Sequence, residues 1–111
     1  MSKLIGEQQL MRIFIGENDR HGHRPLYEAL LRKEGFAGAT VLRGVCGFGA
    51  NRVYHTQKLL DLSADMPMVI EVVDSQEKIA AIMPQIDAMM GGGMITLEKA
   101  TVIRYTSKPE K

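Results

Sequence analysis

The stretch LMRIFI, residues 10–15, decides the fold of this chain because it carries large apolar side chains on both sides of an extended backbone. Successive side chains alternate along a strand, so Met11 and Ile15 would point to one side. Leu10 and Phe14 would then point to the other side. A strand that is apolar on both sides is typical of the middle of a covered sheet. We therefore expect residues 10–15 to form a central strand.

Two segments further along have the spacing of helices. Pro25 suits the first turn of a helix, where its missing N–H costs nothing, and the apolar residues after it predict a helix over 25–34. The second helix should begin at Asp74 or Ser75, either of which can cap it, and it carries an apolar stripe. Pro84 interrupts this stripe, and we expect a kink or a break there.

Three more strands are predicted, at 40–46, 68–73 and 95–105. The order of elements is then β-α-β-β-α-β, the ferredoxin-like arrangement of the α+β class. This arrangement predicts a four-stranded antiparallel sheet with its first and third strands at the centre and both helices on one face.

A chain of 111 residues has room for one domain, which we place at 9–105. Residues 1–8 are expected to be a flexible polar leader, and 106–111 a polar tail. The segment 47–66 is long for a connection in a compact domain, and such loops are usually functional or mobile. We expect it to be mobile, either as a contact arm for a partner or as a solvated insertion.

Composition excludes several classes of function. The net charge is +1, with basic and acidic residues interleaved, whereas nucleic-acid binders usually show a basic face. Cys46 is the one cysteine and is expected to be a small buried residue. The chain shows neither a secretory leader nor an apolar run long enough to enter a membrane, so the cytoplasm is the expected compartment.

Two helices cover only one face of a four-stranded sheet, yet the strands are apolar on both faces. The candidates for the uncovered face are Leu10, Phe14, Val69, Val73 and Val102. Burying such side chains stabilises a protein by about 1.5–3 kcal/mol each. Self-association is therefore expected, and a monomer with an apolar patch is the alternative.

Gly91, Gly92 and Gly93 are the best candidate for a ligand site, because consecutive glycines let backbone N–H groups converge on an anion. A flexible end to the second helix is the alternative. Arg104 could pair with an anion across a subunit boundary, or could be an exposed strand arginine. Gly47 and Gly49 do not have the spacing of a dinucleotide-binding fingerprint.

Other chemistry has less support from the residues. His21 and His23 lie near Asp19, but a metal site needs three or four convergent ligands, so no metal site is assigned. Glu71 and Glu98 would be paired carboxylates if their strands were neighbours. No nucleophile and base accompany them, and we do not expect an enzyme.

Three segments resemble a known family. They are RPLYEAL at 24–30, GATVLRGVCGFG at 38–49 and DMPMVIE at 65–71. Together they look like a PII-like family catalogued as a domain of unknown function. The resemblance extends from Gln9 to Tyr105, and its most specific part is the GATVxRG block.

The resemblance implies a homotrimer of ferredoxin-like subunits, with ligand clefts between neighbours that bind an adenine nucleotide. The glycine turn at 91–93, Arg104, Gly47 and Gly49 would form the cleft. Met94 stands where the PII turn has a lysine, so a ligand less charged than a triphosphate is expected.

The resemblance also implies a role for the loop at 47–66. Arg52, Tyr54 and His55 in this loop would contact a membrane transporter or an enzyme. The chief alternative is a divalent-metal-handling trimer of the cation-tolerance type. An RNA-recognition module on the same frame would need stacking aromatic residues on the central strands, where Phe14 is the one clear candidate.

Overall fold

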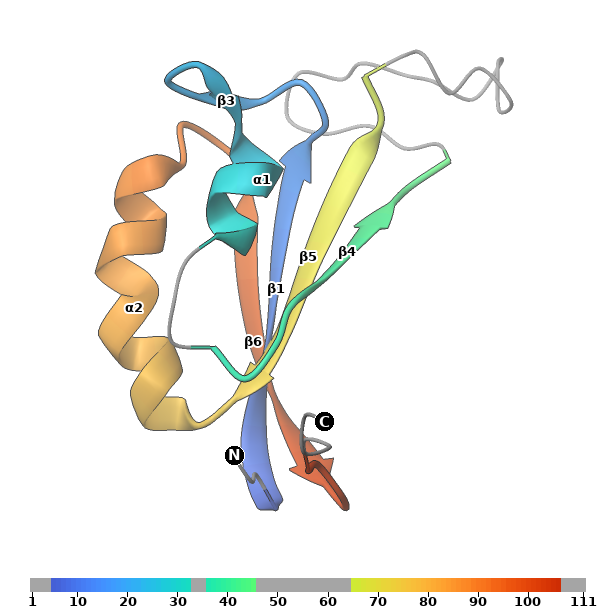
Figure 1. Ribbon diagram of the computed structural model, residues 1–111, viewed down its shortest axis with the longest axis vertical. Coiled ribbons are helices and arrows are strands. Elements are labelled where there is room, and N and C mark those ends of the chain that lie inside the picture. The colour runs from blue at the N-terminus through green and yellow to red at the C-terminus, as the bar shows by residue number, and fades with distance from the viewer. Residues whose placement is uncertain (1–4, 33–35, 46–64, 107–111) are drawn as a thin grey trace, which may run out of the picture.

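The computed structural model describes residues 5–32, 36–45 and 65–106. Four strands form one antiparallel sheet: β1 (Gly6–Gly16), β4 (Thr40–Arg43), β5 (Pro67–Asp74) and β6 (Met94–Val102). Their order across the sheet is β4-β5-β1-β6, so β1 and β5 are the central strands (Figure 1). The predicted sheet and its two central strands are confirmed.

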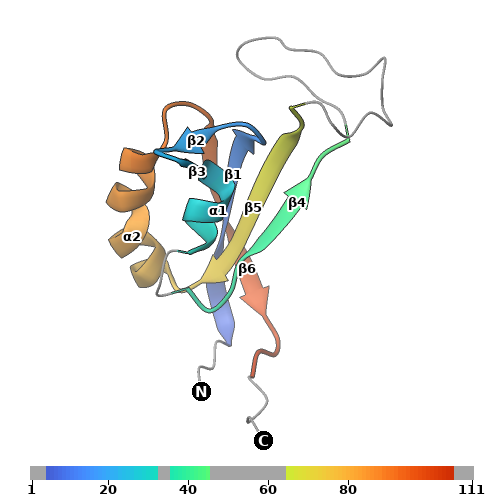
Figure 2. The same cartoon turned by 45° about the horizontal axis from the view of Figure 1, so that its top comes forward.

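Two helices and a small hairpin complete the fold. The helices are α1 (Leu26–Leu31) and α2 (Gln76–Met89). The hairpin consists of β2 (Arg20–His21) and β3 (Arg24–Pro25), and it lies beside α1 at one end of the molecule (Figure 2). Apart from this hairpin, the element order is the predicted ferredoxin-like βαββαβ order of the α+β class.

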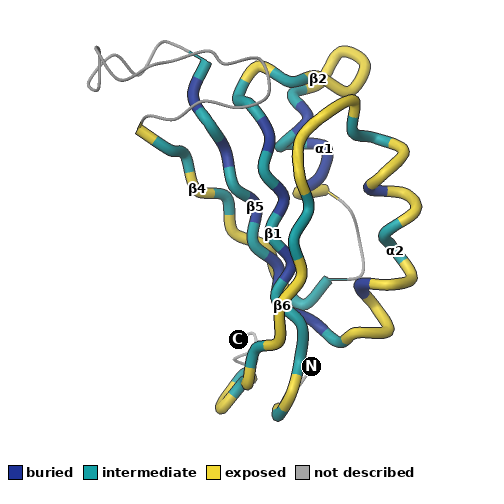
Figure 3. The backbone as a smooth tube through the Cα atoms, turned by 180° about the vertical axis from the view of Figure 1, so that it is seen from behind, coloured by how far each residue is buried: buried dark blue, intermediate teal, exposed yellow. Residues whose placement is uncertain are grey.

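The core lies between the two helices and one face of the sheet. Its buried side chains come from alternate positions of the central strands and from both helices: Met11, Ile13, Ile15, Leu26, Leu30, Met68, Ile70, Val72, Ile79 and Ile86. Figure 3 shows this alternation of buried and partly buried positions along β1 and β5. Both helices therefore cover the same face, as predicted.

The start of α2 differs in detail from the prediction. Ser75 is its N-cap, and the Ser75 hydroxyl accepts a hydrogen bond from the Lys78 N–H at 3.2 Å. Asp74 is buried and accepts hydrogen bonds from the N–H groups of Ala37 and Ser75, both at 2.7 Å. Pro84 lies within a continuous helix, so the predicted break is absent.

Several predicted boundaries were wrong. β1 begins at Gly6, so residues 6–8 pair with β6 and are not part of a leader. The strand expected to reach residue 46 ends at Arg43, and the last strand ends at Val102 rather than at 105.

The first helix and the long loop also need correction. The first helix is shorter than predicted, with Pro25 as its N-cap, and its predicted stop near 33–35 lies outside the described residues. Met66 was assigned to the mobile loop but is fully buried. No helix within 5–32, 36–45 and 65–106 is long and apolar enough to cross a bilayer.

Candidate functional site

The glycine turn after α2 has two different parts. Gly93 has a φ of 107°, and a Cβ at this position would lie 2.5 Å from the carbonyl oxygen of Phe14. Gly91 and Gly92 face open space, because a Cβ at either position would meet no atom within 4 Å. Gly93 is therefore required by the fold, while the backbone of Gly91 and Gly92 is accessible to a ligand.

This turn lies at the same end of the sheet as both ends of the 46–64 segment. β6 starts at Met94, which pairs with Phe14, while β5 starts at Pro67, which pairs with Gly16. β4 ends at the same end of the sheet, where Arg43 pairs with Met68 (Figure 1). The end of β4 and the starts of β5 and β6 thus lie at the same end of the sheet.

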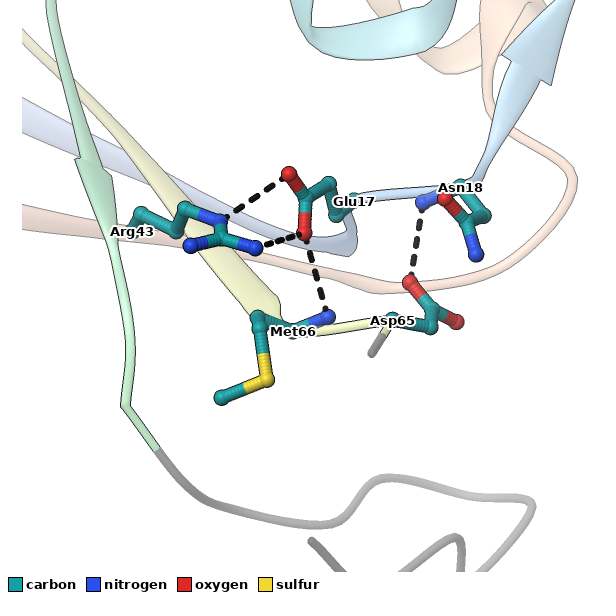
Figure 4. Close-up of polar contacts among 5 residues, drawn as sticks. All are labelled: Glu17, Asn18, Arg43, Asp65 and Met66. Carbon is teal, nitrogen blue, oxygen red and sulfur yellow. Dashed lines mark hydrogen bonds and ion pairs between the residues drawn. The ribbon is translucent and has the colours of Figure 1, made fainter. Parts of the chain in front are cut away.

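An ion pair joins the strand ends at this place. Arg43 donates from Nε and Nη2 to the two carboxylate oxygens of Glu17, at 2.9 and 2.8 Å (Figure 4). The hydrogen bond from Arg43 lowers the pKa of Glu17 below its ordinary value of 4.5, although desolvation opposes this shift. The two-point geometry is the favoured one for arginine and a carboxylate.

Residues just before β5 are tied to the same cluster. The Met66 N–H donates to Glu17 at 3.4 Å, and the Glu17 N–H donates to the Met66 carbonyl at 2.8 Å. The Asn18 N–H donates to the Asp65 carboxylate at 2.9 Å (Figure 4). Hydrogen bonds therefore join the residues just before β5 to those just after β1.

Arg104 lies at the opposite end of the sheet from the glycine turn. It follows β6, whose nine residues span roughly 25 Å of extended chain. Tyr105 beside it donates from its hydroxyl to the Ala37 carbonyl at 2.9 Å. Within one subunit the fold does not bring Arg104 to the turn, so any joint role requires a neighbouring subunit.

The remaining predicted site residues lie outside the described part of the chain. These residues are Gly47, Gly49, Arg52, Tyr54 and His55. Their roles as ligand and partner contacts stay predictions.

The face of the sheet opposite the helices carries the residues that were predicted for it. In the register of β1 and β5, Leu10 pairs with Val73 and Phe14 pairs with Val69. These four residues lie on the face opposite the helices. Leu42 and Met94, which the sequence analysis missed, share it and are 49% and 54% exposed. Within one subunit, this face is a partly exposed apolar surface.

Charged residues also occupy the centre of this face. Arg12 on β1 donates from Nε to Glu71 at 2.9 Å, and from Nη1 to Glu98. The hydrogen bond that Arg12 donates to Glu71 raises the pKa of Arg12 above its ordinary value. Glu71 and Glu98 were considered as facing carboxylates on neighbouring strands, but β1 lies between them and its arginine pairs with both.

The proposed histidine cluster does not form a metal site in the described residues. The Asp19 carboxylate accepts a hydrogen bond from the Gly16 N–H at 2.9 Å. No group of three or more histidine, cysteine, aspartate or glutamate side chains within 5–32, 36–45 and 65–106 is placed to hold a metal ion.

Comparison with known proteins identifies the family. The family model DUF190, described as uncharacterized ACR, COG1993, matches residues 8–102. The chain belongs to the DUF190 family. A UPF0166 protein of Aquifex aeolicus is 35% identical over 102 residues, covering 89% of this chain and 96% of the relative. A UPF0166 protein of Methanocaldococcus jannaschii is 29% identical over 100 residues, covering 86% and 92%.

A solved structure shares the fold of this DUF190 chain. It is CPII from Thiomonas intermedia K12, bound to ADP and bicarbonate, with a TM-score of 0.55 and 18% identity. The match covers 86% of this chain and 88% of that chain. The fold of this DUF190 protein is therefore PII-like, which confirms the family resemblance drawn from the sequence.

The sequence analysis missed the cluster at the base of the long segment. Glu17 follows β1, Arg43 ends β4 and Asp65 precedes β5, and antiparallel pairing brings these three strand ends to one end of the sheet. The predicted strand at 40–46 placed Arg43 inside a strand, so the sequence did not show that it lies near Glu17.

Proposed function

We propose that this DUF190 chain is a PII-like regulatory protein that binds a small anion, an adenine nucleotide, in clefts between the subunits of a homotrimer. The observation that carries the proposal is the shared fold with CPII, a protein bound to ADP and bicarbonate. We propose a regulator rather than an enzyme, because the residues considered from the sequence include no paired nucleophile and base.

The proposed cleft is built around the glycine turn. Gly91 and Gly92 face open space, which lets their N–H groups approach phosphate oxygens without interference from a Cβ. Gly47 and Gly49 would contribute from the start of the long segment. Arg104 would come from a neighbouring subunit, because the turn and Arg104 lie at opposite ends of β6.

The trimer is supported by the apolar face of the sheet. Leu10, Phe14, Val69 and Val73 lie there, with the exposed Leu42 at its edge. Covering such side chains with other subunits would contribute about 1.5–3 kcal/mol for each one fully buried. We propose further that Arg52, Tyr54 and His55 in the 47–66 segment contact a membrane transporter or an enzyme.

Isothermal titration calorimetry with ADP, on protein whose mass is measured by light scattering, tests the proposal. We expect a trimer that binds ADP and a Gly92→Asp variant that binds it at least tenfold more weakly while remaining a trimer, because a carboxylate repels phosphate. Gly38→Asp is the matched control, since Gly38 also faces open space.

Two results would contradict the proposal. Equal affinity of wild type and Gly92→Asp would remove the turn from the site. A monomeric protein that binds none of ADP, AMP and ATP would contradict the proposal of a nucleotide-binding trimer as a whole. Stabilisation by divalent metal alone would favour a metal-handling protein of the cation-tolerance type.

A further inference from the structure

A cavity of about 610 Å³ lies outside the proposed cleft, between the β2–β3 hairpin, α1 and the last turn of α2. Its volume is in the range of small-molecule sites. Every wall comes from one subunit, so the cavity exists without assembly. The connection after α2 passes beside the hairpin in Figures 1 and 2. Met89, the last residue of α2, lines the cavity.

One wall of the cavity is basic. Arg24 and Arg32 line it, with Glu28 between them at intervals of four residues. Two guanidinium groups and one carboxylate leave one positive charge in excess. His21 and His23 add imidazole groups, each of which has an N–H donor in either neutral tautomer.

The two arginines are only loosely paired. Both approach the same oxygen of Glu28, Oε1, with Arg32 Nη2 at 3.4 Å and Arg24 Nε at 4.0 Å. The Glu17–Arg43 pair of the same molecule shows the contrast, with two contacts of 2.8 and 2.9 Å. Arg24 and Arg32 therefore keep N–H groups that could donate to the oxyanion of a ligand. The negative charge of Glu28 would partly repel such a ligand.

The hairpin that carries His21, His23 and Arg24 is held in place by several hydrogen bonds. Arg20 donates from its guanidinium to the carbonyl of His23 across the turn. The Leu26 N–H donates to the Asp19 carbonyl at 2.8 Å, which ties the hairpin to the start of α1. The turn itself is closed by Gly22, whose φ is 64°. The backbone that carries His21, His23 and Arg24 is thus held in place by contacts within the subunit.

The cavity also has apolar lining residues. Pro25, Ala29 and Met89 line it. Small-molecule pockets usually combine apolar lining residues with a few polar groups that orient the ligand.

We propose that this cavity is a second ligand site, specific for a small molecule that carries a phosphate or carboxylate oxyanion. Arg24 and Arg32 bind the oxyanion from two sides, and the two histidines donate additional hydrogen bonds. The site goes beyond the proposed nucleotide cleft, because it needs neither the glycine turn nor a neighbouring subunit.

Calorimetry on the full chain with inorganic pyrophosphate, and separately with citrate, tests this proposal and distinguishes a phosphate from a carboxylate ligand. Arg24→Gln with Arg32→Gln should weaken binding of the preferred probe roughly tenfold or more, since hydrogen bonds to charged groups are lost. Glu28→Gln should strengthen binding severalfold, because it removes the competing carboxylate.

Matched controls separate a local site from general charge. Lys78→Gln with Lys99→Gln removes two exposed positive charges elsewhere, and Glu77→Gln removes one negative charge. Neither should change the affinity by more than about twofold, since exposed charges beyond a Debye length are screened. Circular dichroism verifies that each variant is folded, and amide chemical shifts of residues 20–32 in the wild type should move on addition of the probe.

Three outcomes would overturn the proposal. The first is no binding of either probe at millimolar concentration. The second is equal weakening by the arginine pair and the lysine pair. The third is loss of probe binding in Gly92→Asp but not in the arginine variant, which would place the probe at the glycine turn and leave the proposed function intact.

Discussion

Replacing Gly93 by alanine should destabilise the protein far more than the same change one position earlier. The φ of Gly93 is 107°, and strain of this kind costs on the order of 1–3 kcal/mol in an L-residue. The added Cβ would also lie 2.5 Å from the Phe14 carbonyl oxygen and 2.9 Å from Met90 Cε. Met90 can move, but the carbonyl belongs to central strand β1, and forced overpacking costs about 1–3 kcal/mol. We expect the free energy of unfolding to fall by about 2–5 kcal/mol.

Gly92→Ala is the matched control. A Cβ at Gly92 meets no atom within 4 Å, so the change should alter stability by less than about 1 kcal/mol. Urea unfolding followed by circular dichroism, at one fixed protein concentration, measures both variants, and the denaturant slope should be unchanged. A Gly93→Ala protein within about 0.5 kcal/mol of wild type would refute the reasoning.

Three further results are expected. Because the folded-state pKa of Glu17 is lowered by Arg43, its contribution to stability is complete above about pH 4.5 and is lost as the pH falls through the folded pKa. In urea unfolding, Glu17→Gln should therefore have a lower free energy of unfolding than wild type at pH 7, and this difference should become smaller in acid. A difference that does not change with pH would contradict the prediction. Asp74→Ala should cost about 1–3 kcal/mol, because two buried N–H groups lose their acceptor, and Ser75→Ala about 1 kcal/mol; equal small losses in thermal unfolding would contradict this. Leu42→Asp should reduce the mass measured by light scattering without loss of fold, because Leu42 is a 49% exposed apolar residue on the face of the sheet opposite the helices. An unaltered mass for Leu42→Asp would exclude this edge from the contact between subunits.

The elements with a strong apolar pattern could be predicted from the sequence. Apolar side chains on both sides of residues 10–15 predicted a central strand, and Leu10, Phe14, Val69 and Val73 lie on the open face to which they were assigned. The resemblance to PII-like proteins rested on the GATVxRG block and agrees with the family match at 8–102. Local patterns and family motifs pointed to the same topology.

Element ends and contacts between distant segments were harder to predict. The hairpin at 20–25 has two-residue strands, too short to show any period. Ser75 and Asp74 are both good helix caps, and only the position of Ala37 shows that Asp74 has another role. The pairs Glu17–Arg43 and Arg12–Glu71 join residues that are far apart in sequence, so they follow from strand order and not from spacing.

The distinction between Gly93 and its two neighbours could not be seen in the sequence. The three glycines are identical in the sequence. In the fold, Gly93 lies close to the carbonyl of Phe14, whereas Gly91 and Gly92 face open space. The cavity beside the hairpin was missed for a related reason. Arg24 and Arg32 are each four residues from Glu28, a spacing typical of ordinary surface ion pairs, and the sequence did not show that the hairpin brings His21 and His23 beside them.

The central position of β1 has a consequence for synthesis on the ribosome. Arg12 pairs with Glu71, 59 residues later, and with Glu98, 86 residues later, so both edges of β1 lack their partners until much more of the chain has been translated. Contacts of such long sequence separation slow folding, and an unpaired apolar strand is prone to aggregate. A nascent chain stalled before residue 94 would expose one whole edge of β1, and such a chain should be a substrate for chaperones that the released protein no longer binds.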